Sequence, residues 1–517
     1  MKKLFSTLWP TAICLLTAGC STTNNDLESS EPLGFYDNAA GLENLTPPSS
    51  GDKFEDFTDN PFVEAAKEPT STFSTDADGA SYAIMRRYLN SGYNVPPQSV
   101  RIEEFLNYFT YDYDAPTDGQ ALAINAEISI CPWNREHQLL RLGLKGRELT
   151  DVEMPRANFV FLVDVSGSMA GSERLDLLKS GLLELLYQLR PDDRISLITY
   201  SGEVKKLLES TPVREADKIR TAISHLNAGG CTAGGEALKM AYEEALSNYD
   251  AKANNRVIMG TDGDFNVGVT STNELVEMVE GYASKGIYMT CLGFGMGNLN
   301  DAMMEQISNK GNGTYHYIDS ENEMMKVLVH ERERFVSVAN DVKCQVTFNP
   351  NIVGKYRLIG YENRLMNNED FTDDKKDAGE IGAGQTVTAL YEIELDKDWE
   401  NLLKSGGYMS DIHYPMIVFD CRYKKSLGTE SIPLKRVINY QEMLEKRENS
   451  ASFYFAAGLA AYGMLLRQSP YKGDATYDMV KKLIGSDGFP IGSSPIDYNA
   501  ELLQLIEKAE KQTERLQ

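Results

Sequence analysis

Residues 158–169 read NFVFLVDVSGSM, an apolar run from Phe159 to Val165 that is interrupted only by Asp164 and ends in a small polar turn. A nearly continuous apolar run is typical of a strand buried on both faces of a parallel sheet. The leucines that follow recur with the spacing of one helical face; they are Leu175, Leu178, Leu182, Leu185 and Leu189. A buried strand followed by an amphipathic helix predicts the first unit of an α/β domain.

The same alternation continues to about Val336. We expect further strands at residues 195–200, 256–261, 288–294 and 314–318. We expect helices at 216–226, 236–246 and 301–308, one from Glu321, and one opened by the capping sequence Ser271–Glu274. This order predicts a doubly wound, Rossmann-like α/β domain with a mostly parallel sheet, which we assign to residues 156–338.

Strand patterns flank this domain on both sides. They lie at 121–130 and 139–144 before it, and at 343–348, 356–361, 386–395 and 416–422 after it. Because the strand character matches, we expect one β-rich, sandwich-like part into which the α/β domain is inserted. Helical patterns lie at 80–89, 100–109, 452–467, 476–484 and 498–511. The last three predict a C-terminal helical region.

The N-terminus has the pattern of a secretory signal. Lys2 and Lys3 precede an apolar run through Leu16, and small residues then lead to Cys20. The sequence TAGC at 17–20 is similar to the bacterial lipoprotein box, although Thr17 stands where that box usually has an aliphatic residue. The similarity implies a lipidated Cys20 and a protein held in the bacterial cell envelope by acyl chains alone, with the outer membrane preferred.

These patterns divide the chain into six segments. They are a signal peptide at 1–19, a lipidated flexible tether at 20–55, an N-terminal region of helices then strands at 56–155, the α/β domain at 156–338, a β-rich domain at 339–440 and the helical region at 441–517.

Composition excludes some classes of partner. The chain has 517 residues, with 42% hydrophobic and 25% charged, as in a folded protein. Its formal net charge of −25 argues against nucleic acid as a partner. Five cysteines follow Cys20, an odd number at wide spacing that is unlike a disulfide framework; they are Cys131, Cys231, Cys291, Cys344 and Cys421. A pair between Cys131 and Cys344 stays open.

Oxygen-bearing side chains gather at the ends of the expected strands. Asp164, Ser166 and Ser168 follow the first strand, Asp262 follows the strand at 256–261, and Thr232 lies in a glycine-rich loop that opens a helix. Ligands of open α/β sheets collect at the carboxyl ends of the strands. A set of hard oxygen donors without His or Cys favours Mg²⁺, with Ca²⁺ or Mn²⁺ as alternatives, over Zn²⁺. Two carboxylates and three hydroxyls also leave room for an outside ligand, and a partner's Asp or Glu carboxylate is the natural one.

The order and spacing of these five residues resemble the metal-ion-dependent adhesion site of von Willebrand factor A (VWA) domains. The resemblance implies that Ser166 and Ser168 bind the metal directly, and that Asp164, Thr232 and Asp262 bind it directly or through water. Further motifs are similar to a family of VWA-containing bacterial lipoproteins with an N-terminal VWA-associated region and a C-terminal domain of unknown function; they are Asn60–Phe62, Ser71–Asp76, Ala80–Tyr82, Val100–Glu104, Pro132–Asn134 and Gly354–Ala378.

The leading interpretation is an adhesion or scaffold module of the cell envelope that binds proteins and is not an enzyme. The sequence lacks GxSxG, HExxH and Walker motifs. Two alternatives are a structural envelope protein whose metal site is unused, and a Mg²⁺-dependent hydrolase in which the loop 229–235 holds a phosphate. We interpret Asp264 as a turn residue or a neighbour of the site, and the Asp76–Gly79 sequence as a turn rather than a calcium loop.

Overall fold

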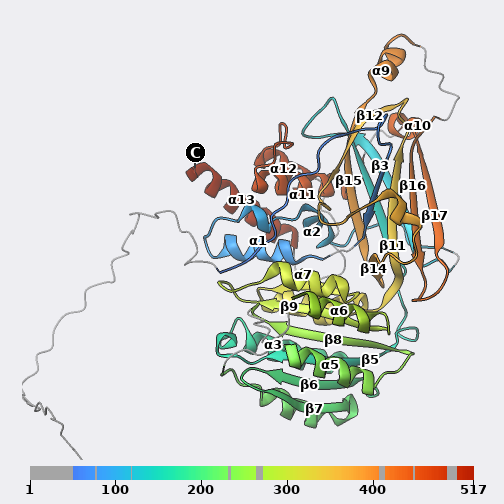
Figure 1. Cartoon of the computed structure of the whole chain (residues 1–517). Coiled ribbons are helices and arrows are strands. Elements are labelled where there is room, and N and C mark those ends of the chain that lie inside the picture. Colours follow the sequence, from blue (N-terminus) through green and yellow to red (C-terminus); the bar gives the residue numbers. More distant parts are fainter. Residues whose placement is uncertain are drawn as a thin grey trace, which may run out of the picture. The chain divides into compact units, whose positions relative to one another are not determined.

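The first apolar run forms β5 (Arg156–Asp164), an inner strand of a six-stranded sheet in the computed structural model (Figure 1). The structure describes residues 51–75, 78–117, 119–230, 235–263, 272–406, 414–445, 449–485 and 498–516. The strand order is β10-β9-β8-β5-β6-β7, parallel except for β7 at the edge. The other bounds are β6 Arg194–Tyr200, β7 Val204–Pro212, β8 Ala253–Thr261, β9 Ile287–Phe294 and β10 Thr314–Ile318.

Helices cover both faces of this sheet. Phe161 and Val163 of β5 pack in one core with Leu182 of α3 (Leu175–Gln188). Val160 and Leu162 pack in another with α5 (Gly235–Ser247). The remaining helices are α4 Ala216–Ser224, α6 Thr272–Ala283, α7 Asp301–Lys310 and α8 Glu321–Met325, which continues as a π-turn over Lys326–His330. The doubly wound α/β prediction is confirmed.

Two further sheets form the β-rich part. One has the order β1-β12-β15-β4-β3 and the other β13-β2-β11-β16-β17, with β14 paired to β11. Their bounds are β1 Val63–Glu64, β2 Thr70–Ser74, β3 Leu122–Ile130, β4 Gln138–Gly146, β11 Ser337–Phe348, β12 Val353–Ile359, β13 Leu365–Met366, β14 Gly379–Gly382, β15 Thr386–Leu395, β16 Pro415–Lys424 and β17 Ile432–Asn439.

Strands from both ends of the chain meet in these sheets. In the first, β4 pairs with β15, and in the second β2 pairs with β11, so each sheet joins segments that precede and follow the α/β domain. Leu142 of β4 and Val346 of β11 belong to one buried core, which places the sheets face to face. The α/β domain is therefore inserted into a β-sandwich, as the matching strand patterns predicted.

The helices before and after the sandwich strands pack together on its outer face. Tyr82 of α1 (Ala80–Asn90) and Phe105 of α2 (Ile102–Asn107) share a core with α11 (Ala451–Arg467) and with Leu390 of β15. The remaining helices are α9 Lys397–Lys404, α10 Tyr440–Glu445, α12 Tyr477–Gly485 and α13 Tyr498–Leu516, and 3-10 turns cover Pro97–Ser99, Gly167–Met169, Val213–Glu215, Arg332–Phe335 and Asn368–Thr372.

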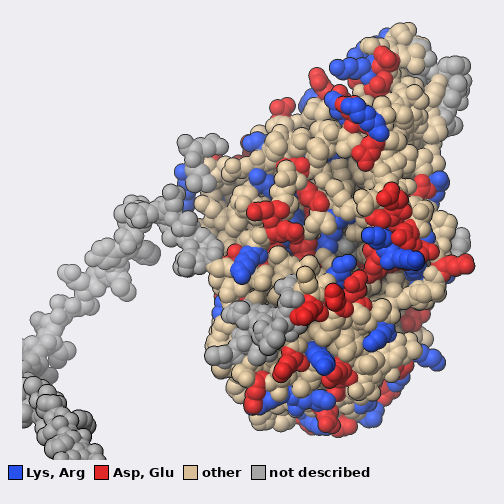
Figure 2. Space-filling model, viewed as in Figure 1, with Lys and Arg blue, Asp and Glu red and all other residues tan. Residues whose placement is uncertain are grey.

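None of the helices in the described ranges is long and apolar enough to cross a membrane. On the face shown in Figure 2, acidic and basic side chains are interspersed over the described surface.

Candidate metal centre

The two carboxylates predicted to bind the metal lie at the same edge of the α/β sheet. Asp164 is the last residue of β5, and Asp262 directly follows β8, which is parallel to β5 and hydrogen-bonded to it. Both side chains are fully buried. Ser166 and Ser168 stand in the turn after β5, so four of the five predicted ligands come from two adjacent strand ends.

Asp164 is held in one orientation by its neighbours. Its Oδ1 accepts a hydrogen bond from the Ser166 backbone N–H at 2.8 Å, and its Oδ2 accepts one from Thr261 Oγ1 at 3.2 Å. The hydroxyl oxygens of Ser166 and Ser168 lie 2.9 Å apart. Burial raises the pKa of Asp164 to about 6, and the nearby charge of Asp262 adds to the increase. The turn thus places two hydroxyls beside a carboxylate, and the charge of that carboxylate is poorly solvated.

Asp262 differs from Asp164 in its hydrogen bonding. Both of its carboxylate oxygens are buried, and neither has a hydrogen-bond partner among the described residues. An ionised carboxylate that accepts no hydrogen bond is costly to bury. A divalent cation would supply the missing partner, so the residues present fit a metal ion of the hard, oxygen-binding class. The described residues hold no group of three or more His, Cys, Asp or Glu placed for a metal, so the hydroxyls would have to complete this donor set.

Thr232 and Asp264 lie outside the described residues, as does Cys20. The start of the glycine-rich loop is described, and it is bonded to the turn that carries the serines. The backbone N–H of Gly229 donates to the Val165 carbonyl at 2.7 Å, and that of Gly167 donates to the Gly230 carbonyl at 3.1 Å. Thr232 follows Gly230 by two residues, and its part in the site stays a prediction.

Arg174 is a neighbour of the site that sequence reasoning missed. Its Nη1 donates to the Ser168 carbonyl at 2.5 Å and lies 4.0 Å from Asp262 Oδ2, while its Nη2 donates to the Met296 carbonyl at 3.0 Å. A Cβ on Gly295, whose φ is +71°, would lie 2.1 Å from Arg174 Nε. Glycine at this position therefore leaves room for the guanidinium. No local pattern reveals this role, because Met296 is far from Arg174 in the sequence.

The loop from Gly295 to Asn300 also contacts the other side of the site. Gly263 follows Asp262 with φ +94°, and a Cβ there would lie 2.5 Å from the Asn300 backbone nitrogen. Asp52 caps the same loop, because its Oδ1 accepts from the backbone N–H groups of Gly297 at 2.8 Å and Leu299 at 2.9 Å. The position of the loop is thus fixed by residues that belong to different parts of the chain.

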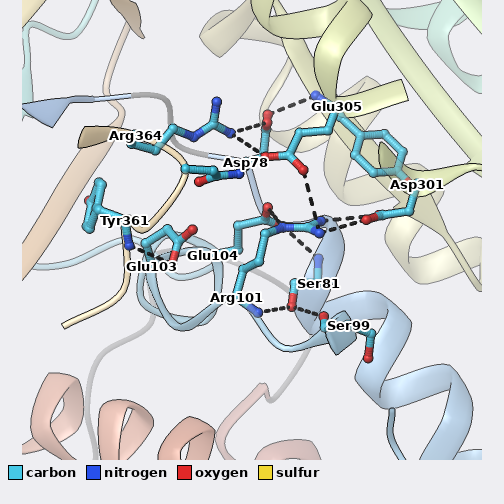
Figure 3. A network of polar contacts seen from close by, with 12 residues as sticks. Asp78, Ser81, Ser99, Arg101, Glu103, Glu104, Asp301, Glu305, Tyr361 and Arg364 are labelled. Carbon is cyan, nitrogen blue, oxygen red and sulfur yellow. Dashed lines mark hydrogen bonds and ion pairs between the residues drawn. The ribbon is translucent and has the colours of Figure 1, made fainter. Parts of the chain in front are cut away.

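A buried ionic network holds α7, which begins directly after this loop (Figure 3). Arg101 bonds Asp301 of α7 at 2.6 and 3.2 Å and also pairs with Glu104, while Arg364 bonds Glu305 at 3.0 Å. The network joins the α/β domain to the N-terminal region and to the sandwich. The acids outnumber the two arginines, and burial raises the pKa of Glu103, which accepts from the Tyr361 N–H, to about 7.

The five cysteines after Cys20 were not expected to form a framework. The four described ones, Cys131, Cys291, Cys344 and Cys421, are buried, and the structure has no disulfide among them. The sequence left a Cys131–Cys344 disulfide open. This bond is absent, since the two residues lie in different cores. Cys291 lies in a core of the α/β domain.

Three family models match successive parts of the chain. The model described as von Willebrand factor covers residues 48–141, that of the von Willebrand factor type A domain covers 158–330, and that of the C-terminal part of the uncharacterized protein YfbK covers 333–512. The α/β domain is thus of the VWA type, and VWA domains mediate protein–protein interaction or adhesion.

Curated relatives extend this similarity. The uncharacterized protein YfbK of Escherichia coli strain K12 is 37% identical over 481 residues, covering 89% of this chain and 82% of that protein. Inter-alpha-trypsin inhibitor heavy chain H3 of Pongo abelii is 26% identical over 319 residues, and the match spans only 33% of its length. Among solved structures, a von Willebrand factor type A protein from Catenulispora acidiphila is 13% identical, with a TM-score of 0.41 and coverage of 67% of this chain and 80% of that one.

Proposed function

The chain belongs to the YfbK-like family of proteins that contain a VWA domain, and we propose that it is an envelope lipoprotein that binds a partner protein through a divalent cation. The cation is held by Asp164, Ser166, Ser168, Thr232 and Asp262. The observation that carries this proposal is the buried Asp262 carboxylate, whose two oxygens have no hydrogen-bond partner among the described residues. A cation relieves this cost and brings the two carboxylates and the hydroxyls together as ligands.

The chemistry of the donors favours Mg²⁺, with Mn²⁺ or Ca²⁺ as substitutes. All five side chains offer hard oxygen atoms, which these ions prefer. Asp164 is already oriented by Ser166 and Thr261, so little reorganisation is needed before binding. Protons compete with the metal, because a buried carboxylate with a raised pKa binds both.

The charge of the loaded site favours an anionic partner. Asp164 and Asp262 together balance a divalent cation, and the guanidinium of Arg174, 4.0 Å from Asp262, adds a further positive charge. An Asp or Glu side chain of a partner protein neutralises that excess and fills the open coordination position. Electrostatic complementarity of this kind contributes specificity more than raw affinity.

The proposed attachment is a lipid at Cys20, with the following residues as a flexible tether. The lipid attachment is supported by the sequence before Cys20, which has the charged Lys2 and Lys3, an apolar run and then small residues. We propose a binding role rather than catalysis. A structural protein with an unused metal site is the second candidate, and a Mg²⁺-dependent hydrolase is a weaker one.

Calorimetry tests the proposal. Mg²⁺, Mn²⁺ and Ca²⁺ are titrated into the metal-stripped mature chain with Cys20→Ala, beside Asp164→Ala and Thr232→Ala variants and an Asp56→Asn control at an exposed position. Saturable one-site binding that both site variants lose and the control keeps would support the proposal. Equal or absent binding in all four proteins would favour the structural alternative.

A further inference from the structure

Two buried thiols face each other across a pair of central strands in the sandwich. Cys344 on β11 and Cys421 on β16 are direct partners in the antiparallel register, and each is 1% exposed. Their side chains interact, and both belong to the core between the two sheets. Direct partners in an antiparallel pair have Cα atoms about 4.5–5.5 Å apart, within the roughly 4.4–6.8 Å that a disulfide spans. The backbone is therefore already placed for a bond.

The other described cysteines have no such neighbour. Cys131 follows β3 and lies in the helical core, and Cys291 lies on β9 in a core of the α/β domain. Neither core contains a second described cysteine. The register of β11 and β16 thus singles out one pair, and that pair is far apart in the sequence.

We propose that Cys344 and Cys421 form an intramolecular disulfide in the exported protein. The oxidant is a disulfide, either of a thiol-oxidising protein or of a small molecule such as oxidised glutathione. One cysteine thiolate attacks the oxidant's disulfide and releases one of its sulfurs as a thiol. The second cysteine thiolate then attacks the mixed disulfide and releases the other. Two electrons pass to the oxidant, and the two protons of the cysteines end on its thiols.

This reaction takes place during folding, before β16 pairs with β11. In the folded protein both sulfurs are inside the core, and burial raises the pKa of Cys344 well above that of a free thiol. The attacking thiolate is therefore scarce once β16 covers β11. A partly folded chain in an oxidising compartment has both thiols exposed.

The bond would stabilise the strand by which the chain returns from the α/β domain to the sandwich. β11 follows that domain directly in the chain and also pairs with β2 from the N-terminal region. A covalent link to β16 would oppose the separation of β11 from the sheet. The unfolding midpoint of the oxidised protein should lie above that of the reduced protein.

Peptide mapping tests the bond in the full-length protein exported by a bacterial host. The protein is unfolded in guanidinium with iodoacetamide and without reductant, digested, and examined by mass spectrometry. We expect one linked peptide pair holding Cys344 and Cys421, while Cys131 and Cys291 carry the alkyl group as internal controls. Alkylation of Cys344 and Cys421 to the same extent as the controls would overturn the proposal.

Two further samples separate the causes of failure, because the proposal rests on the proposed envelope location. The chain without residues 1–19, made in a reducing cytosol and refolded with oxidised glutathione, should form the same link. Absence of the link in both proteins would overturn the pairing of these two cysteines. Absence from the exported protein alone would overturn both the disulfide in that protein and the envelope assignment. Cys421→Ser should free Cys344 for alkylation, whereas Cys291→Ser should leave the link intact.

Discussion

Arg174 Nη1 lies 4.0 Å from Asp262 Oδ2, beside a carboxylate that is fully buried and that accepts no hydrogen bond from the described residues. The guanidinium is itself fixed by the carbonyls of Ser168 and Met296. In the metal-free protein it is a fixed positive charge close to Asp262. With a cation bound at the proposed site, it would repel the cation and attract an anion.

The effect of Asp262→Asn on the free energy of unfolding should change sign when metal is added. Without metal the variant removes a buried carboxylate whose oxygens accept no hydrogen bond and whose ion pair with Arg174 is long, so its free energy of unfolding should be about 1–3 kcal/mol higher than that of the wild type. With saturating Mg²⁺ the wild type should be the more stable protein, because only it gains binding energy. Chemical denaturation in EDTA and in Mg²⁺ measures both. The exposed Asp56→Asn should show neither effect, and a variant less stable in both solutions would contradict the account.

Arg174→Gln should tighten metal binding while weakening the response to carboxylates. Removing a positive charge near the cation should raise Mn²⁺ affinity about tenfold. Acetate should displace Mn²⁺-bound water less readily in the variant, which the relaxation rate of water protons reports. Arg174→Lys keeps the charge and should behave more like the wild type. Unchanged Mn²⁺ affinity in Arg174→Gln would remove this residue from the proposed site.

Gly263→Ala should disturb the site through the backbone. The new Cβ would lie 2.5 Å from the Asn300 nitrogen, at a φ of +94° that strains any other residue. We expect a loss of about 2 kcal/mol in the free energy of unfolding and weaker Mg²⁺ binding, because Asp262 is the preceding residue. Gly281→Ala in α6 is the control, since a Cβ there meets nothing within 4 Å. Equal stability of the two variants would count against the packing described.

Glu103 should make the protein less stable at higher pH. Its pKa is about 7 in the folded protein against an ordinary 4.5, mainly because of burial, with the Glu362 and Glu104 charges adding to the increase. The folded state therefore binds more protons between those pH values, and the free energy of unfolding falls as pH rises through that window. Glu103→Gln keeps an acceptor for the Tyr361 N–H and should be more stable than the wild type at pH 8 but not at pH 4. Denaturation curves at both pH values check this, with the exposed Glu430→Gln as control.

The sequence predicted the parts of the fold whose side chains are buried on regular faces. The apolar run from Phe159 to Val163 marked β5, and the leucine spacing marked α3. It missed β7 (Val204–Pro212) and β17 (Ile432–Asn439), which are edge strands whose lysines and arginines face solvent and break the apolar pattern. Edge strands need few apolar residues, so hydrophobic periodicity detects them poorly.

The same limit applies to the site. Asp164, Ser166 and Ser168 could be placed because they lie at and just after the end of one strand, and Asp262 because it directly follows a neighbouring parallel strand. Arg174 and Asp52 could not, since each contacts a loop near residue 297 that is distant in the sequence. The pairing of Cys344 with Cys421 across the two strands depends on strand register, which no local pattern reveals.

The most direct test of the metal site is an anomalous difference map from crystals of the mature protein soaked in Mn²⁺. We expect one strong peak within coordination distance of Asp262, Ser166 and Ser168, and its loss in Asp262→Asn crystals of the same form. A map without a peak at this edge of the sheet, or a peak that persists in the variant, would contradict it.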